Sequence, residues 1–341
     1  MDFKKVIEAK EYDFLREDEH LKDRIMLLSL GGSHAYGTQR EDGQSDIDVR
    51  GVALERPSDL IGLTEFEQIV ETNTDTTIYA FNKMIKLLMN CNPNVIEILG
   101  CKPEHYLIVS KEGQQLLDNR DIFLSQKAIG SFSGYASQQL SRLENALARD
   151  RLGQVKKEEH ILNSIRNAMM TFESRYTEFD ENKVILDLGD SDKEDMDKEI
   201  KVTIDLKEYS LRELAGMLGE MQNVIRLYDK VNHRNKKKDD NHLDKHAQHL
   251  IRLYIMGLDI LERGKIVTYR ENELDILRKI RTGGYRKDDE SYDESFFELV
   301  EEYKKRFKYA AKNTFLPKEP DSKKIEELIM DINGKIIKGL M

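Results

Sequence analysis

One stretch of the chain, residues 25–52, restricts the fold more than any other. Ile25 to Leu30 form an apolar run whose length is typical of a buried strand rather than a helix. The run stops at Gly31-Gly32-Ser33, where the glycines predict a turn, and the residues that follow predict a brief helix. After a polar loop, Ser45-Asp46-Ile47-Asp48-Val49-Arg50-Gly51-Val52 predicts a second strand.

The second strand carries two carboxylates. Side chains alternate along a strand, so Asp46 and Asp48 are expected on one face, with Ile47 and Val49 in the core. Two carboxylates on one face repel each other unless a cation lies between them. Ser33 would open a helix whose free backbone N–H groups attract a phosphate. Each motif alone is most often a turn or a solvated strand face, but the pair predicts a phosphate-binding turn beside a divalent-metal site.

These residues resemble the signature of nucleotidyltransferases of the DNA polymerase β superfamily, which is a Gly-Ser pair followed by Asp-x-Asp on the next strand. More narrowly, Gly-Ser-His-Ala-Tyr-Gly and Ser-Asp-Ile-Asp-Val-Arg-Gly resemble predicted bacterial and phage nucleotidyltransferases, including the group associated with RNA ligases. The run Asn-Pro-Asn-Val-Ile-Glu-Ile-Leu extends the resemblance to about residue 100. The resemblance implies an α/β (α+β) N-terminal domain with a small mixed sheet.

The resemblance also implies a metal site and a nucleotide site. Both carboxylates of Asp-x-Asp, here Asp46 and Asp48, are expected to bind Mg²⁺ or Mn²⁺, with two ions in the site. A third carboxylate on a neighbouring strand is expected to complete it, and we predict Asp75, with Glu71 as the alternative. Hard oxygen ligands suit Mg²⁺. Gly32 and Ser33 are expected to hold the β- and γ-phosphates of an NTP, ATP among the candidates.

A second constellation lies on a helix predicted over residues 243–263, which ends before Gly264. With about 100° of rotation per residue, five side chains that can donate hydrogen bonds fall on one face of this helix. They are His242, Lys245, His246, His249 and Arg252. Such a face suits a triphosphate, with Lys245 and Arg252 as the main contacts and His246 and His249 orienting them. The alternatives are a zinc site, which the neighbouring cations oppose, and a solvated basic face.

Length and composition set the remaining expectations. A chain of 341 residues is long enough for two domains, which we predict as 1–124 and a mostly helical 125–341 with a β-hairpin insertion near 183–206. The net charge of −10 argues against broad coating of nucleic acid, although it allows a nucleic acid end as substrate. No apolar stretch approaches the roughly 18 residues of a membrane span, and no signal-like segment opens the chain, so a cytoplasmic location is expected.

The sequence therefore predicts a metal-dependent nucleotidyltransferase that moves an NMP from an NTP to an acceptor hydroxyl and releases pyrophosphate. The acceptor stays open among an RNA end, a protein and a small molecule. Two other classes also stay open: a non-catalytic nucleotide-binding sensor, and an interaction protein of the toxin–antitoxin type.

Overall fold

The computed structural model describes residues 3–39, 45–151, 184–191, 197–204, 240–287 and 292–340, with a few single positions between 155 and 226. By its contacts the chain divides into two compact units. The first comprises Met1–Gln139, Ala247–Lys287 and Tyr292–Met341, and the second comprises Leu140–His246 and Asp288–Ser291. The predicted domain boundary near residue 124 stays a prediction, because compactness does not say which segments fold alone.

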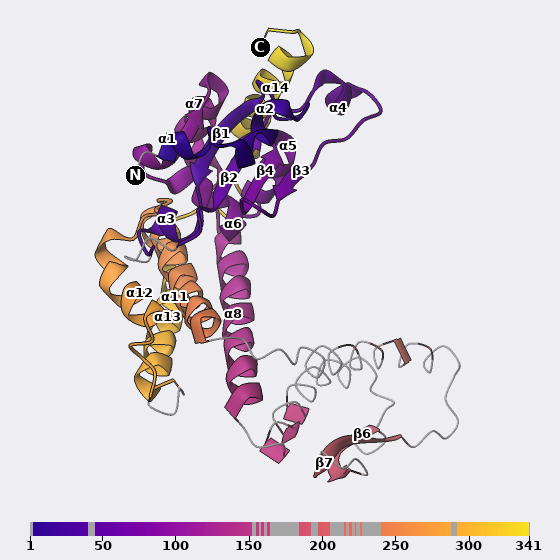
Figure 1. Ribbon diagram of the computed structural model, residues 1–341, viewed down its shortest axis with the longest axis vertical. Helices are drawn as coiled ribbons and strands as arrows, with labels where there is room; N and C mark the ends of the chain where they lie inside the picture. Colours follow the sequence, from indigo (N-terminus) through magenta and orange to yellow (C-terminus); the bar gives the residue numbers. More distant parts are fainter. Residues whose placement is uncertain are drawn as a thin grey trace. The chain divides into compact units, whose positions relative to one another are not determined.

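A mixed five-stranded sheet forms the centre of the first unit, as the resemblance implied (Figure 1). Its order is β3-β4-β2-β1-β5; β1 pairs antiparallel with β2 and β5, β2 pairs parallel with β4, and β3 pairs antiparallel with β4. The strands are β1 (Ile25–Leu30), β2 (Val49–Ala53), β3 (Gln68–Glu71), β4 (Thr76–Ala80) and β5 (Tyr106–Val109).

The apolar run predicted as a strand is β1, a central strand in which every residue after Ile25 is buried. One face of the sheet packs on a core that includes Leu28, Leu30, Val49 and Ile78. Short helical segments surround the sheet. They are α1 (Phe3–Val6), η1 (Lys10–Tyr12), α2 (Phe14–Glu17), α3 (Gly32–Tyr36), α4 (Pro57–Ile61), α5 (Phe81–Leu88), α6 (Pro93–Ile96), η2 (Glu97–Gly100), η3 (Pro103–His105), α7 (Lys111–Asp118) and η4 (Arg120–Phe123).

The C-terminal part is helical, as predicted. Its elements are α8 (Lys127–Arg151), α11 (Asp240–Arg263), η5 (Glu271–Glu273), α12 (Leu274–Arg281), α13 (Glu294–Asn313) and α14 (Ser322–Ile337). Helix α11 ends where the sequence predicted, because Gly264 adopts the left-handed conformation (φ +61°) that follows many helices. No helix in the described ranges is long and apolar enough to cross a bilayer.

The last helix returns to the N-terminal elements. Asn333 in α14 donates to the Asn82 Oδ1 atom at 3.0 Å, and Gln115 in α7 donates to an Asp331 carboxylate oxygen at 3.0 Å. The sheet, α11 from Ala247 onward, and helices α12 to α14 belong to the same compact unit.

In the second unit, β6 (Val184–Asp190) and β7 (Lys198–Ile204) pair antiparallel over the segment where the sequence predicted a hairpin. Their register runs from Val184 opposite Ile204 to Asp190 opposite Lys198. The Lys198 ammonium group pairs with the Asp190 carboxylate at the turn end of this ladder.

Candidate active site

The turn after β1 lies directly against the segment that carries the aspartates. The Gly31 N–H donates to the Asp48 carbonyl at 2.7 Å, so the two segments stay joined beyond the last paired residues, Leu30 and Val49. Gly32 has a φ of +52°, and a Cβ atom added there would lie 1.5 Å from the Asp48 Oδ2 atom. Glycine is therefore required at this position for two reasons: the positive φ disfavours other residues, and the Asp48 carboxylate leaves no space for a side chain.

The two aspartates do not lie on a strand, which corrects the sequence prediction. Strand β2 begins only at Val49, and residues 45–48 precede it without regular secondary structure. Ile47 packs against the core and Val49 is buried, as predicted. Asp46 is exposed and Asp48 is half-buried.

The guanidinium of Arg50 lies between two carboxylates. Its Nη2 atom is 3.2 Å from the Asp75 Oδ1 atom and 3.8 Å from the Asp48 Oδ1 atom. Asp75 is in the β3–β4 turn with a φ of +43°, and its carbonyl accepts from the Val49 N–H at 3.2 Å, which keeps it beside the start of β2. Asp75 and Asp48 therefore both lie near the Arg50 guanidinium, a cation that the protein itself supplies.

The alternative third carboxylate has a local contact. Glu71, the last residue of β3, accepts a hydrogen bond from the Asn73 N–H at 3.0 Å within the same turn. Across the part of the chain that the structure describes, no three His, Cys, Asp or Glu side chains are grouped to hold a metal ion. The roles of Asp75 and Glu71 stay predictions.

A buried polar cluster, Tyr36–Glu97–Arg252, connects α3 to α11. The Tyr36 hydroxyl donates to the Glu97 Oε2 atom, and the Arg252 Nη1 atom donates to the same oxygen at 3.0 Å. The Arg252 guanidinium also lies 3.6 Å from the centroid of the Tyr36 ring, a cation–π contact. Tyr36 is the last residue of α3, so this cluster fixes the end of the segment that begins at Gly32.

The charges of the cluster lie in a low-dielectric environment. Burial raises the pKa of Glu97 and lowers the pKa of Arg252, because both charged forms lose water. The direct hydrogen bond between the two groups favours the charged form of each. The Arg50 charge also lowers the pKa of Glu97 and the Asp48 charge raises it, so the cluster and the aspartate site interact electrostatically.

From the predicted helix face, Arg252 contacts Tyr36, the last residue of α3. Lys245 is exposed, and His246 and His249 are half-buried. Lys245 and His246 belong to the second compact unit. Nucleotide binding by these four residues stays a prediction.

Sequence reasoning did not identify Glu97 and Tyr36 as site residues. A signal for Glu97 was present, since a carboxylate between Ile96 and Ile98 in an apolar run must find a partner when buried. Its partner is 155 residues away, so the sequence could not name Arg252.

A family model described as RlaP, RNA repair pathway DNA polymerase beta family, matches residues 5–252. The chain belongs to this family. As an RlaP-family protein it is a nucleotidyltransferase of the DNA polymerase β type associated with an RNA repair pathway. The matched range contains Gly32, Asp48, Asp75 and Glu97, and it ends at Arg252. Comparison with curated proteins and with solved structures gave no match.

Proposed function

We propose that this protein transfers the NMP of an NTP, ATP among them, to an acceptor hydroxyl. The acceptor oxygen forms a bond to the α-phosphorus, the bond from that phosphorus to the β-phosphate oxygen breaks, and pyrophosphate leaves. The observation that carries the proposal is the contact between the Gly31–Gly32 turn and Asp48. The Gly31 N–H donates to the Asp48 carbonyl at 2.7 Å, and a Cβ atom added at Gly32 would lie 1.5 Å from the Asp48 carboxylate.

Asp46 and Asp48 offer the oxygen ligands that Mg²⁺ or Mn²⁺ prefers, and neither residue is fully buried. When bound, two such ions would neutralise charge on the attacking and leaving oxygens. Asp75 fits this set less well, because Arg50 already pairs with it at 3.2 Å. We retain Asp75 as the third carboxylate, in a role that requires Arg50 to exchange partners.

The remaining residues bind and orient the nucleotide. Gly32 and Ser33, at the start of α3, would hold the β- and γ-phosphates. The Tyr36–Glu97–Arg252 cluster acts on the same segment from its other end, so we assign Arg252 a positioning role beside the predicted contact with the triphosphate. His249 would add to that contact, and nucleotide binding by Lys245 and His246 stays a prediction.

The acceptor that fits the family description best is an RNA end, and the cytoplasm is the location we propose. A non-catalytic nucleotide sensor remains the second candidate, supported by the Arg50 side chain that pairs with Asp75 and lies near Asp48. A toxin–antitoxin-type interaction protein would use the same chemistry on a protein hydroxyl.

The experiment that tests the proposal is incubation of the purified protein with Mg²⁺, each NTP labelled at its α-phosphate, and a cell lysate. We expect covalent label in the RNA fraction, no label with the Asp46→Asn/Asp48→Asn variant, and unchanged labelling with Asp118→Asn, which alters an exposed aspartate in α7. Label in protein would redirect the proposal to a protein acceptor. Absence of covalent label from every fraction would favour the sensor.

A further inference from the structure

The second half of α13 exposes a basic stripe, which we define as Lys305, Lys308, Tyr309 and Lys312, continued after the helix by Phe315 and Lys318. All six side chains are exposed. At about 100° per residue, the four helical members fall within one arc of about 100°. The opposite side of α13 is buried through Phe296, Val300, Phe307 and Ala310.

The stripe concentrates positive charge in an acidic protein. From Tyr303 to Lys318 the sequence has six Lys or Arg residues and no Asp or Glu, whereas the whole chain has a net charge of −10. Two of the six are paired, Lys304 with Glu301 at 2.7 Å and Arg306 with Glu262 at 2.6 Å. The four lysines of the stripe form no ion pair with any described residue.

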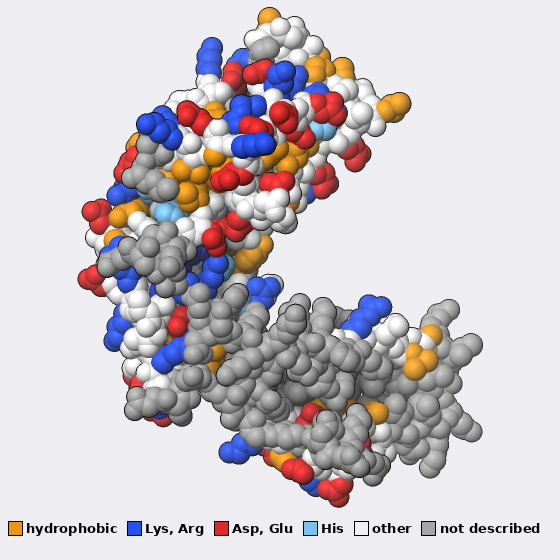
Figure 2. All heavy atoms as spheres, in the orientation of Figure 1, with side chains coloured by type: hydrophobic (Ala, Val, Ile, Leu, Met, Phe, Trp, Pro, Cys, Tyr) orange, Lys and Arg blue, Asp and Glu red, His pale blue; other side chains and the backbone are white. Residues whose placement is uncertain are grey.

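This local concentration of positive charge matters because the visible described surface is electrically mixed. On the face shown in Figure 2, Lys and Arg side chains alternate with Asp and Glu over the described surface. A polyanion would gain little from such a surface, since attraction and repulsion largely cancel within a Debye length. The four lysines of the stripe offer that gain because they form no ion pair with a described residue, although Lys305 and Lys308 act electrostatically on Glu301.

Two aromatic residues lie between lysines of the basic stripe in the sequence. Tyr309 and Phe315 are each 70% exposed. Phe315 is held in place, because its neighbour Leu316 is buried and the Thr314 hydroxyl donates to the Leu261 carbonyl at 2.8 Å. Gly264 lies against the Phe315 ring, where an added Cβ would be 2.9 Å from the Cζ atom. The ring is therefore an ordered aromatic surface open to solvent.

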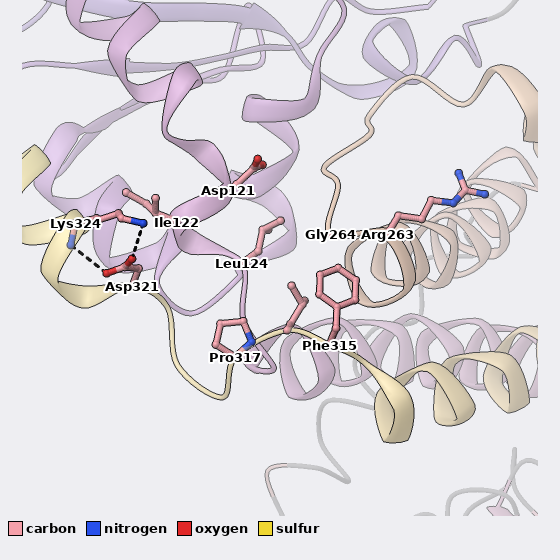
Figure 3. A pocket seen from close by; sticks show the side chains of 10 residues that line it. Asp121, Ile122, Leu124, Arg263, Gly264, Phe315, Pro317, Asp321 and Lys324 are labelled. Atoms are coloured by element: carbon pink, nitrogen blue, oxygen red, sulfur yellow. Dashed lines mark hydrogen bonds and ion pairs between the residues drawn. The ribbon is translucent and has the colours of Figure 1, made fainter.

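A pocket of about 430 Å³ adjoins this ring. Figure 3 shows Phe315, Pro317 and Leu124 among the side chains that line it, with Arg263 extending from the end of α11. Lys324 contributes a further cation, which pairs with Asp321 at 3.1 Å. The apolar walls suit a flat aromatic group such as a base, although the carboxylates of Asp121 and Asp321 also line the pocket.

We propose that the basic stripe and the adjoining pocket bind single-stranded nucleic acid. The lysines contact phosphates, and Tyr309 and Phe315 stack on unpaired bases, one of which enters the pocket. Exposed rings gain from stacking only when bases are unpaired, which favours a single strand over a duplex and over an acidic peptide. The inference rests on the proposed function only in naming this strand as the acceptor; binding itself can be measured without transfer.

The test is fluorescence anisotropy of the full-length protein with labelled oligouridine and oligodeoxythymidine of about twelve nucleotides. We expect each of Tyr309→Ala and Phe315→Ala to weaken binding by about fivefold to one hundredfold. Log affinity falls as log salt concentration rises, and in the Lys308→Gln/Lys312→Gln variant this fall should be less steep, with a slope smaller in magnitude by about 1.4. Comparison of the two oligonucleotides shows whether RNA is preferred over DNA.

Two control variants test whether a loss of binding comes from the basic stripe or from any loss of surface charge or apolar surface. Lys10→Gln/Lys22→Gln removes the same charge from exposed lysines elsewhere, and Met330→Ala removes an apolar side chain that is 69% exposed. Both should bind like the wild type. Wild-type affinity in the stripe variants, equal affinity for a duplex, or displacement of the strand by polyglutamate at equal charge would each overturn the proposal. Intact binding without label transfer would instead count against the proposed function alone.

Discussion

Gly32 and the Asp48 carboxylate lie so close together that no other residue fits between them. The φ of +52° at Gly32 disfavours L-residues, and a Cβ atom there would lie only 1.5 Å from Oδ2, which excludes a methyl group unless Asp48 moves. The same proximity places the glycine turn beside the carboxylate that would hold a metal ion. This residue therefore joins the proposed phosphate and metal sites.

Gly32→Ala should weaken NTP binding, because the new methyl group displaces Asp48 and blocks close approach of phosphate to the backbone. The backbone conformation alone should cost about 1–2 kcal/mol of folding free energy. Titration calorimetry with NTP and thermal unfolding measure the two effects. Gly130→Ala in α8 is the control, since its Cβ would meet nothing within 4 Å and NTP binding should not change. NTP affinity equal to wild type in Gly32→Ala would remove the phosphate-binding turn.

The short helix α4 is stabilised by hydrogen bonds to one of its side chains, Asp59. The Asp59 carboxylate accepts from the Arg56 N–H, from the Arg56 Nε atom and from the Thr64 hydroxyl, at 3.0, 3.0 and 2.6 Å. These hydrogen bonds hold the pKa of Asp59 well below its usual range, the Arg56 side chain contributing most. A depressed pKa stabilises the folded state above the pKa of an unfolded aspartate, and this stabilisation is lost as the pH falls.

Asp59→Asn should therefore destabilise the protein by about 1–3 kcal/mol near neutral pH, because hydrogen bonds to a charged acceptor are lost. The difference from wild type should shrink below about pH 4, where the unfolded aspartate binds a proton. Thermal unfolding of both proteins at several pH values measures this. Asp118→Asn should show a smaller, less pH-dependent change. A constant difference between Asp59→Asn and wild type at all pH values would contradict the proposed ionisation.

At the scale of the whole molecule, local patterns were predictable and distant contacts were not. The apolar period predicted β1 and α11, and glycine predicted the end of α11 at Gly264, since these signals are local. The predicted start of β2 was wrong by several residues, because alternation of apolar and polar side chains does not show where strand pairing begins. The return of α14 to Asn82 and the Glu97–Arg252 pair depend on residues far apart in sequence.

The central claim is nucleotidyl transfer, and the most direct test is the ratio of pyrophosphate to RNA-linked NMP formed in one reaction. Purified protein, Mg²⁺, cellular RNA and the preferred NTP should yield pyrophosphate and RNA-linked NMP in equal amounts. Asp48→Asn should bind the NTP and yield neither, because the turn remains while the metal site is lost. Release of orthophosphate with NDP would contradict the account, and so would pyrophosphate at the wild-type rate from Asp48→Asn.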